Sequence, residues 1–542
     1  MRRWRDLGLF AVLLLIAAVI LPMRLGGPDL DRTATALALA GPAAGAALSL
    51  AVGRPSLAIG ALAGLAAYVS GALAIRGINV PLAVVIAVAV SAAGGALVAL
   101  ATARLDIVGL LAATLLAAVA LAAITQALPG LSGGQAGLGP LPPLGTPVSG
   151  GGVAHLTSTG DLHALLAAAL LVTAVATALL SGRVGALWRA VGSDRGRAAG
   201  SGLRPLRAEV IALAVAGGLA GFGGALSAHV NGVATPDLFA PDVVALPLLA
   251  ALLAGRGSAL GAVLAGVGTA LLGNLILPDL GWRGPPSATA LALGLLAVAV
   301  VASLLPAAGV RRRPQPTEIS ADDPWPLAGD EFLGATLIVD DLEVRAGPLT
   351  LIRGLSLSAP AGAVHGLVGP NGAGKSSVLG ALARGPSARV RLDGALGQVV
   401  LQPQAGGGFP ACSVDETLLL AARGGGRTGA DAAAVAALWR ERLGLHGAGR
   451  TLCAELSAGR RRLVDLARVL LRRPAVLLCD EPLAGLDPAA RAAAVSLLRA
   501  AAAAGLTIVL AEHDREAVAT LASSTTELRR EDLRPVLAEP AL

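Results

Sequence analysis

The chain has 542 residues, of which 55% are hydrophobic and 14% are charged, and its mean hydropathy is +0.73. A composition this apolar excludes a single water-soluble globule. The net charge of +7 does not indicate nucleic-acid binding, because the arginines flank apolar segments and form no basic patch interleaved with aromatic residues.

Apolar segments fill the first 310 residues. A helix needs about 20 apolar residues to cross a bilayer. Although the first segment follows MRRWRD as in a signal peptide, it lacks a small-residue cleavage site, so we interpret it as a membrane helix. Ten candidate spans lie near residues 7–23, 33–52, 55–75, 80–101, 105–128, 161–181, 207–230, 240–255, 257–277 and 287–307. The eighth of these spans is short enough to re-enter the membrane without crossing it.

The placement of arginines predicts the orientation of these spans, because cytoplasmic loops carry an excess of basic residues. Arginines at 2, 3 and 5 and at 311–313 place both ends of the segment in the cytoplasm, which requires an even number of spans. The stretch 182–206, with five arginines, also falls inside, whereas the Gly- and Pro-rich stretch 129–160 falls outside. His229 and Asn231 lie at the outer end of a span, and we expect them to be interfacial residues and not ligands.

Several segments of this half resemble the permease family of branched-chain amino acid importers, the LivM type. The similarity rests on PSLAIGALAGLAAYVSGAL (55–73), LSGGQAGLG (131–139), RVGALWRAV (183–191) and AGGLAGFGGALSAHVNGVATPDLF (216–239), which occur in the family's order. The chain departs from the family at Ile59, where a histidine is usual, and retains only Asp194 of an acidic cluster. The resemblance implies an all-α polytopic permease domain over residues 1–310, whose loop 182–206 packs against an ATPase. The alternative is that the arginines of this loop only set orientation.

Residues 311–334 are rich in proline and charge and show no periodicity, which predicts a linker between two domains. The remainder, residues 335–542, has the length of one α/β domain. Its three cysteines, Cys412, Cys453 and Cys479, share no CxxC spacing, so we expect reduced cytoplasmic thiols and neither a disulfide framework nor a zinc site.

The segment GPNGAGKS (369–376) contains the only lysine of the chain and follows a β-rich run. The pattern G-x-x-x-x-G-K-S predicts a phosphate-binding loop, in which backbone N–H groups and a helix N-terminus surround a phosphate. Lys375 would contact the β- and γ-phosphates, where a planar guanidinium is too bulky. The candidate nucleotide-binding residues of this loop are Gly369, Pro370, Asn371, Gly372, Ala373, Gly374, Lys375, Ser376 and Ser377.

A second apolar run, AVLLCDEP (475–482), predicts a strand that ends in Asp480 and Glu481. A carboxylate at the end of such a strand can hold Mg²⁺, and the next one can take a proton from the attacking water. Together with LSAGR (456–460), AGLDP (484–488) and AEHD (511–514), this set resembles the ATPase of ABC transporters, and LSAGRRRLVDLAR is similar to its amino-acid-importer branch.

The resemblance to ABC ATPases implies a role for each matching residue. Ser376, Asp480 and Gln404 would bind Mg²⁺, and Glu481 would be the general base. His513 would contact the γ-phosphate, and Gln404 would connect the nucleotide to the permease, with Gln402 as its rival by spacing. The residues that would complete the site of an opposing ATPase are Ser457, Gly459 and Asp487.

Three departures bear on activity. Ala346 stands where the family places an aromatic residue that stacks on adenine, and losing one such contact typically costs about 1–3 kcal/mol. The separation between Lys375 and Gln404 is short for the family, and Arg460 replaces the glutamine of the signature. Because the lysine, both acids and the histidine are present, we still expect hydrolysis.

The sequence therefore predicts an N-terminal membrane domain of about ten helices followed by a P-loop ABC ATPase domain. We expect ATP-driven import of branched-chain amino acids or a related small polar solute across a bacterial cytoplasmic membrane, with ATP and Mg²⁺ as cofactors. The expected partners are a second, LivH-like permease, a second, LivF-like ATPase, an extracytoplasmic solute-binding protein and membrane lipid. The alternatives are a catalytically silent regulatory subunit, suggested by Ala346, and a half-size exporter.

Overall fold

The computed structural model contains two compact units. One comprises residues 1–192 and 204–311, and the other comprises residues 193–203 and 312–542. The tenth expected span, 287–307, and most of the expected linker lie outside the described residues. The structure describes residues 2–147, 153–155, 158–200, 203–255, 257–276, 319, 324–327, 332–346, 349–370, 372–394, 398–404, 408–513, 515–528 and 536–537.

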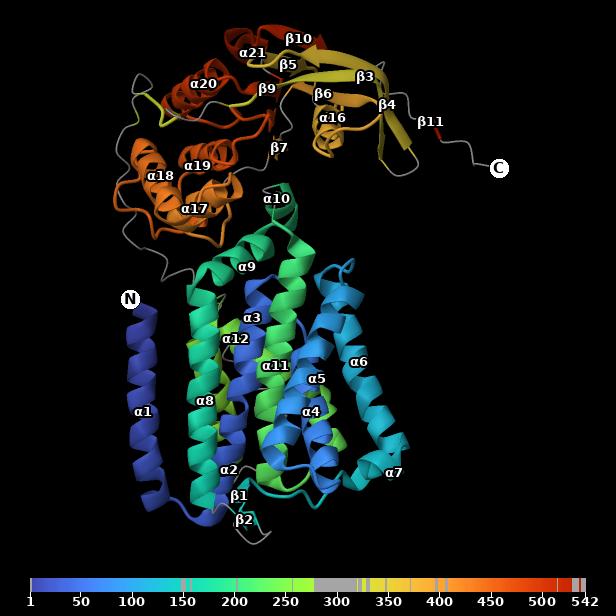
Figure 1. Cartoon of the computed structure of the whole chain (residues 1–542), viewed down its shortest axis with the longest axis vertical. Coiled ribbons are helices and arrows are strands. Elements are labelled where there is room, and N and C mark those ends of the chain that lie inside the picture. The colour runs from blue at the N-terminus through green and yellow to red at the C-terminus, as the bar shows by residue number, and fades with distance from the viewer. Residues whose placement is uncertain are drawn as a thin grey trace. The chain divides into compact units, whose positions relative to one another are not determined.

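The first unit is a bundle of helices, several of which run alongside one another, with α9 lying across their ends (Figure 1). A hairpin of β1 (Gly145–Pro147) and β2 (Val153–His155) accompanies the helices. The helices are α1 (Arg2–Arg24), α2 (Gly27–Ala38), α3 (Ala40–Ala51), α4 (Ala58–Ile75), α5 (Val80–Ala101), α6 (Ile107–Ala127), α7 (Pro129–Ser132), α8 (Ser158–Ser181), α9 (Arg183–Ser193), α11 (Pro205–Asn231), α12 (Pro241–Ala254) and α13 (Ala259–Leu271).

Seven helical segments in the described part of this unit are long and apolar enough to cross a membrane, with α2 and α3 together forming one of them. The expected eighth and ninth spans are the shorter helices α12 and α13, of 14 and 13 residues. At about 1.5 Å per residue, α12 does not reach the ~30 Å of a hydrocarbon core. Helix α13 continues into a π-helical turn at Leu272–Ile276, after which the chain leaves the described residues. The multi-pass helical domain is confirmed, and the count of ten is not.

Close packing of the bundle depends on glycines at the contacts of α11 with its neighbours. A Cβ atom added to Gly224 would lie 2.1 Å from the carbonyl oxygen of Ala63 in α4. Where α3 contacts α11, a Cβ atom on Gly45 of α3 would lie 2.4 Å from the carbonyl oxygen of Ala216 in α11. Small residues allow such close backbone approach between membrane helices. They place α11 against both α3 and α4.

The second unit is built on a parallel sheet of five strands in the order β10-β5-β9-β8-β7. All residues of its three central strands are buried, as expected for parallel strands covered on both faces. The strands are β5 (Val364–Val368), β7 (Val399–Gln402), β8 (Val476–Asp480), β9 (Thr507–Glu512) and β10 (Ser524–Glu527).

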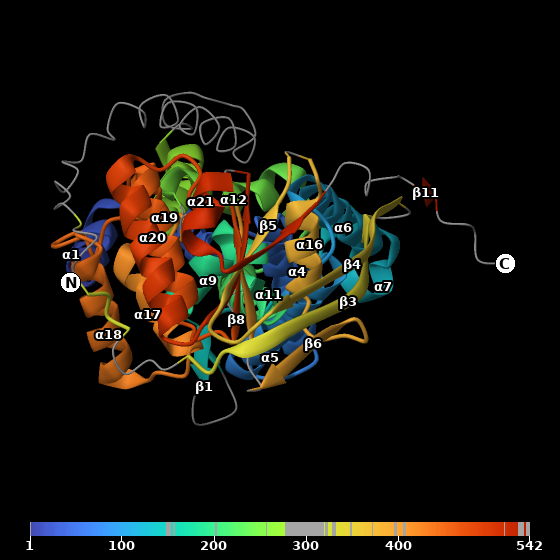
Figure 2. The same ribbon diagram turned by 90° about the horizontal axis from the view of Figure 1, so that it is seen from above.

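An antiparallel sheet and a group of helices complete this unit. The sheet has the order β11-β4-β3-β6, with β3 (Ala335–Ala346), β4 (Leu349–Ala359), β6 (Val390–Gly394) and β11 (Val536–Leu537). Figure 2 shows β3, β4 and β6 on one side of the unit and most of its helices on the other. The helices are α10 (Arg195–Gly200), α16 (Lys375–Leu382), α17 (Val414–Gly424), α18 (Gly429–Arg442), α19 (Ala458–Leu470), α20 (Pro488–Ala503) and α21 (Arg515–Leu521).

Two segments outside the expected ATPase domain group with this unit. The indole of Trp325, in the expected linker, donates to Ser496 Oγ at 3.2 Å, and the Arg442 guanidinium lies 4.0 Å from its ring centre. Trp325 is only 6% exposed, so this part of the linker packs into the ATPase core. Residues 193–203 also belong here, and Arg197 donates to the carbonyl of Gly408. Their role in coupling stays a prediction.

Candidate functional site

The loop between β5 and α16 forms one wall of a cavity of about 400 Å³. Positive φ angles of +82° at Gly372 and +79° at Gly374 turn the chain into α16, a conformation that glycine adopts without steric cost. The cavity lining agrees with most of the loop residues expected to bind phosphate, although Asn371 lies outside the described residues. The lining residues are Leu351, Gly372, Ala373, Gly374, Lys375, Ser376, Ser377, Gln404 and Glu481.

Lys375 is held within this loop and is only 5% exposed. Its ammonium group donates to the carbonyl oxygens of Gly369 at 2.7 Å and Pro370 at 3.1 Å. A buried cation at a helix N-terminus is a suitable environment for a phosphate group. The loop therefore fits the triphosphate of a nucleotide.

The two acids expected at the end of β8 lie beside this loop. Asp480 is buried, and burial raises the pKa of its carboxyl, with the negative charge of Glu481 adding to the effect. Among the described residues, Asp480 Oδ1 has no hydrogen-bond partner, while a hydrogen bond from Ser376 favours the charged carboxylate. A buried carboxylate oxygen without a partner, next to a serine hydroxyl, fits Mg²⁺, which prefers oxygen ligands.

Gln404 lies in the cavity, and Gln402 does not. The Gln404 side chain donates from Nε2 to Glu481 Oε2 at 2.6 Å. Gln402 is fully buried, and its Nε2 lies 3.4 Å from Asp465 Oδ2. The geometry therefore favours Gln404 over its rival as the glutamine of the site.

The remaining expected site residues lie away from this cavity. His513 is 52% exposed, with Nδ1 at 3.6 Å from Glu512 Oε2. Ser457 begins α19, and Asp487 begins α20 by accepting from the N–H of Ala490 at 2.8 Å. A Cβ atom on Gly459 would lie 3.2 Å from Asp487 Oδ2, so these two expected residues are neighbours. None of these four residues lines the cavity beside the phosphate-binding loop.

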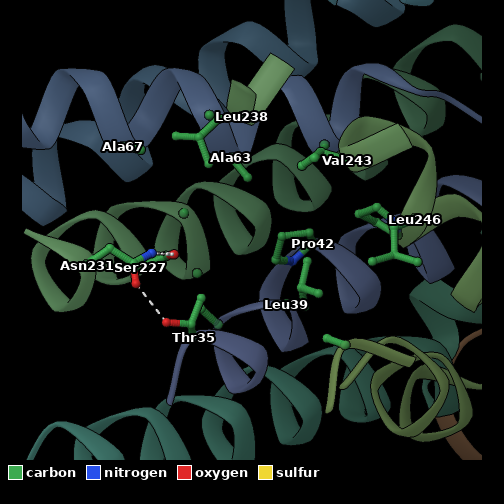
Figure 3. A pocket seen from close by; sticks show the side chains of 17 residues that line it. Thr35, Leu39, Pro42, Ala63, Ala67, Ser227, Asn231, Leu238, Val243 and Leu246 are labelled. Carbon is green, nitrogen blue, oxygen red and sulfur yellow. Dashed lines mark hydrogen bonds between the residues drawn. The ribbon is translucent and has the colours of Figure 1, made fainter. Parts of the chain in front are cut away.

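The bundle contains a separate cavity of about 330 Å³ that the sequence did not reveal. Figure 3 shows its polar side chains gathered on one side, opposite Leu246 and Val243. Thr35 donates to Asn231 Oδ1 at 2.7 Å, and Asn231 Nδ2 donates to Ser227 Oγ at 3.2 Å. None of the 17 residues that line it within the described part of the chain carries a charge: Thr35, Ala38, Leu39, Pro42, Gly60, Ala63, Gly64, Ala67, Gly223, Gly224, Ser227, Asn231, Leu238, Val243, Leu246, Pro247 and Ala270.

The expectation that His229 is an interfacial residue is wrong. His229 is only 1% exposed, and its Nδ1 lies 2.6 Å from the carbonyl oxygen of Pro142. Because a carbonyl only accepts, Nδ1 carries the proton, and Nε2 accepts from Ser70 at 2.8 Å. His229 thus joins α11 to α4 and to the loop before β1. Asn231, two residues later, is exposed at the rim of the cavity.

Comparison with known families decides the identity of both units. The family described as "Branched-chain amino acid transport system / permease component" matches residues 32–304, and the family described as "ABC transporter" matches residues 352–484. The chain belongs to both families. It is a fused permease and ATPase of an ABC transporter, in which ATP hydrolysis is coupled to transport, and the ATPase domain is cytoplasmic.

Curated relatives match the ATPase half of this transporter. A Streptomyces coelicolor protein, "Hemin import ATP-binding protein HmuV", is 38% identical over 223 residues, which cover 38% of this chain and 78% of that protein. "Nod factor export ATP-binding protein I" of Burkholderia orbicola is 36% identical over 32% of this chain and 62% of its own length. "Methionine import ATP-binding protein MetN" of Mesorhizobium japonicum is 34% identical over 34% of this chain and 54% of its own. Since these names include both import and export, the ATPase half does not determine direction.

Proposed function

We propose that this transporter imports branched-chain amino acids or a related small polar solute across a bacterial cytoplasmic membrane. The observation that carries the proposal is the permease-family match over residues 32–304, because the membrane domain determines which solute can cross. The proposed boundaries are a permease domain over 1–310, a linker over 311–334 and an ATPase domain over 335–542.

The cavity of the bundle supports a cargo of this class. Its volume of about 330 Å³ lies at the lower end of the ~300–1,000 Å³ typical of small-molecule sites. Leu39, Val243 and Leu246 offer an apolar wall, and Thr35 and Asn231 offer hydrogen bonds at its rim. A charged side chain would lose its hydration there without gaining a counter-charge. The lining thus favours a solute with an apolar body and a hydrogen-bonding end.

The ATPase unit would perform hydrolysis with residues that line its cavity and with Asp480, which lies beside it. Lys375 and the N–H groups of the loop would hold the phosphates, while Ser376, Asp480 and Gln404 would hold Mg²⁺, which neutralises phosphate charge. Glu481 would accept the proton of the attacking water. Gln404 would help to orient the Glu481 carboxylate through the 2.6 Å hydrogen bond between their side chains.

The residues outside this cavity would act in the assembled transporter. Ser457 and Gly459 would complete the nucleotide site of a second, LivF-like ATPase, and Asp487 would cross that interface. His513, which is half exposed, would contact the γ-phosphate. A LivH-like second permease and an extracytoplasmic solute-binding protein would complete the importer.

The direction and cargo are tested in vesicles that contain the assembled transporter with its ATPase facing inward. With MgATP trapped inside and the solute-binding protein outside, we expect labelled L-leucine to accumulate, and L-lysine to be excluded. Uptake of urea in place of leucine would identify the related polar solute. ATP-dependent loss of leucine from preloaded vesicles would show export and contradict the proposal.

The role of the bundle cavity is tested by Thr35→Val, which removes the hydroxyl that faces Asn231 at nearly constant volume. Loss of one hydrogen bond to the solute is expected to raise the half-saturating leucine concentration about threefold to tenfold. The Thr35 hydroxyl also lies 2.9 Å from the carbonyl oxygen of Asp31 in its own helix. Thr269→Val is the matched control, because the Thr269 hydroxyl likewise lies 2.8 Å from a carbonyl oxygen of its own helix, that of Ala265, but does not line the cavity. Equal effects of the two substitutions would remove the cavity from the transport route.

A further inference from the structure

Arg462 contacts both chain segments that meet in the nucleotide site. It lies on α19, and its side chain is buried, at 8% exposure for the residue. Its Nη1 donates to the carbonyl of Gln404 at 2.6 Å and to that of Pro403 at 3.2 Å. Its Nη2 donates to the carbonyl of Glu481 at 3.1 Å. One guanidinium therefore holds the backbones of the two residues whose side chains also touch.

These contacts form a closed ring of hydrogen bonds. The Gln404 amide donates to the Glu481 carboxylate at 2.6 Å, and Arg462 connects the backbones of the same two residues from behind. A ring of this kind restricts both ends of the side-chain contact. The guanidinium is suited to this task because it is planar and offers donors in fixed directions.

The backbone of Glu481 needs such support. Its φ angle is +46°, in the left-handed region that a residue with a side chain rarely adopts. The N–H of Glu481 donates to the carbonyl of Ala511 at 2.8 Å, and its carbonyl accepts from Arg462. Both backbone groups of this strained residue are thus bound. Strain of this size persists only where surrounding contacts fix the conformation.

The charge of Arg462 also suits its position. Its guanidinium is close enough to interact electrostatically with the carboxylates of Asp480, Glu512 and Asp465. Two of these, Asp480 and Glu512, are the last residues of the neighbouring strands β8 and β9, and Glu481 directly follows β8. Placing a permanent positive charge behind a group of buried acids reduces their mutual repulsion.

We propose that Arg462 is a positioning residue for ATP hydrolysis, which fixes the relative placement of the Gln404 amide and the Glu481 carboxylate. The inference rests on the roles proposed above for those two residues. Arg462 itself does not line the nucleotide cavity, and it acts through the carbonyls of Gln404 and Glu481 that it holds. Since it lies on the helix that begins with Ser457, displacement of α19 would also displace the catalytic pair.

The test compares Arg462→Gln and Arg462→Lys in the assembled, reconstituted transporter, with steady-state ATP hydrolysis as the readout. For Arg462→Gln we expect kcat to fall at least tenfold while the KM for ATP changes less than threefold, because the phosphate loop is untouched. Lysine keeps the charge but cannot hold both carbonyls in a fixed fork, so its kcat should fall twofold to fivefold. Arg499→Gln is the control, because Arg499 also donates to a backbone carbonyl, that of Thr520 at 2.7 Å, but is exposed on α20.

A kcat of Arg462→Gln within threefold of wild type would overturn the inference, as would a loss confined to KM, or equal losses in the glutamine and lysine variants. Should Arg462→Gln fail to assemble, Arg462→Lys decides alone, and a wild-type kcat there would overturn it. Glu481→Gln, measured in parallel, separates the role of Glu481 from that of Arg462. If Glu481→Gln still hydrolyses ATP, the proposed role of Glu481 fails. If it is inactive while Arg462→Gln is normal, only the present inference fails.

Discussion

The two units of this transporter bear their functional features in different ways. In the ATPase unit the features are charged side chains: Lys375 and Glu481 line one cavity, and Asp480 lies beside them at the end of β8. In the bundle the main feature is a space left by glycines and alanines, with polar groups only at its rim. Side-chain chemistry at fixed spacing can be read from a sequence, whereas a space depends on how several helices pack together.

The sharpest test of this difference is Lys375→Arg, which keeps the charge of the only lysine in the chain. The buried Lys375 ammonium fits between two carbonyl oxygens at 2.7 and 3.1 Å, where a guanidinium would displace the loop. We expect ATP hydrolysis to fall at least about 100-fold, a loss typical of removing a group that stabilises transition-state charge.

The control for this substitution is Arg384→Lys, the reverse exchange at an exposed position just after α16. It should leave hydrolysis within twofold of wild type. Hydrolysis by Lys375→Arg at a similar rate would show that a positive charge alone is sufficient in the loop. The ATPase site would then not depend on the particular side chain at this position.

In the bundle, Gly224→Ala is expected to act through packing alone. The added methyl group would lie 2.1 Å from the Ala63 carbonyl oxygen, so α4 and α11 must separate. Overpacking of this kind typically costs about 1–3 kcal/mol of stability, measured as a lower unfolding temperature of the purified protein. Gly218→Ala on the same helix is the matched control, because its nearest neighbour would lie at 3.6 Å. Equal unfolding temperatures for the two variants would contradict the packing argument.

The ATPase fold and most of its site followed from the sequence because each motif places a particular functional group at a fixed spacing. Gln404 and Gln402 could not be separated by spacing, since Gln402 ends β7 and Gln404 follows two residues later, and only the contact with Glu481 favours one of them. Arg462 was not recognised, because it stands in a run of three arginines and only the fold shows that its side chain turns inward.

In the membrane half, the order of the segments and their hydropathy predicted the bundle but neither the short length of α12 nor the burial of His229. Hydropathy does not show which face of a helix meets a neighbour, and His229 is buried through partners 87 and 159 residues away. Trp325 is a similar case, because the composition around it indicates a linker, and its partners Trp439 and Ser496 lie far along the chain.

The central claim is that the ATP site of this chain drives solute movement through the bundle of the same chain. Uptake of L-leucine by vesicles carrying Glu481→Gln, with MgATP inside and unaltered partner subunits, tests it most directly. The account predicts uptake below about one-hundredth of the wild-type rate, because loss of a positioned general base typically costs about 10²–10⁴-fold in rate. Uptake at the wild-type rate, with ATP still required, would show that another subunit supplies the energy and would contradict the claim.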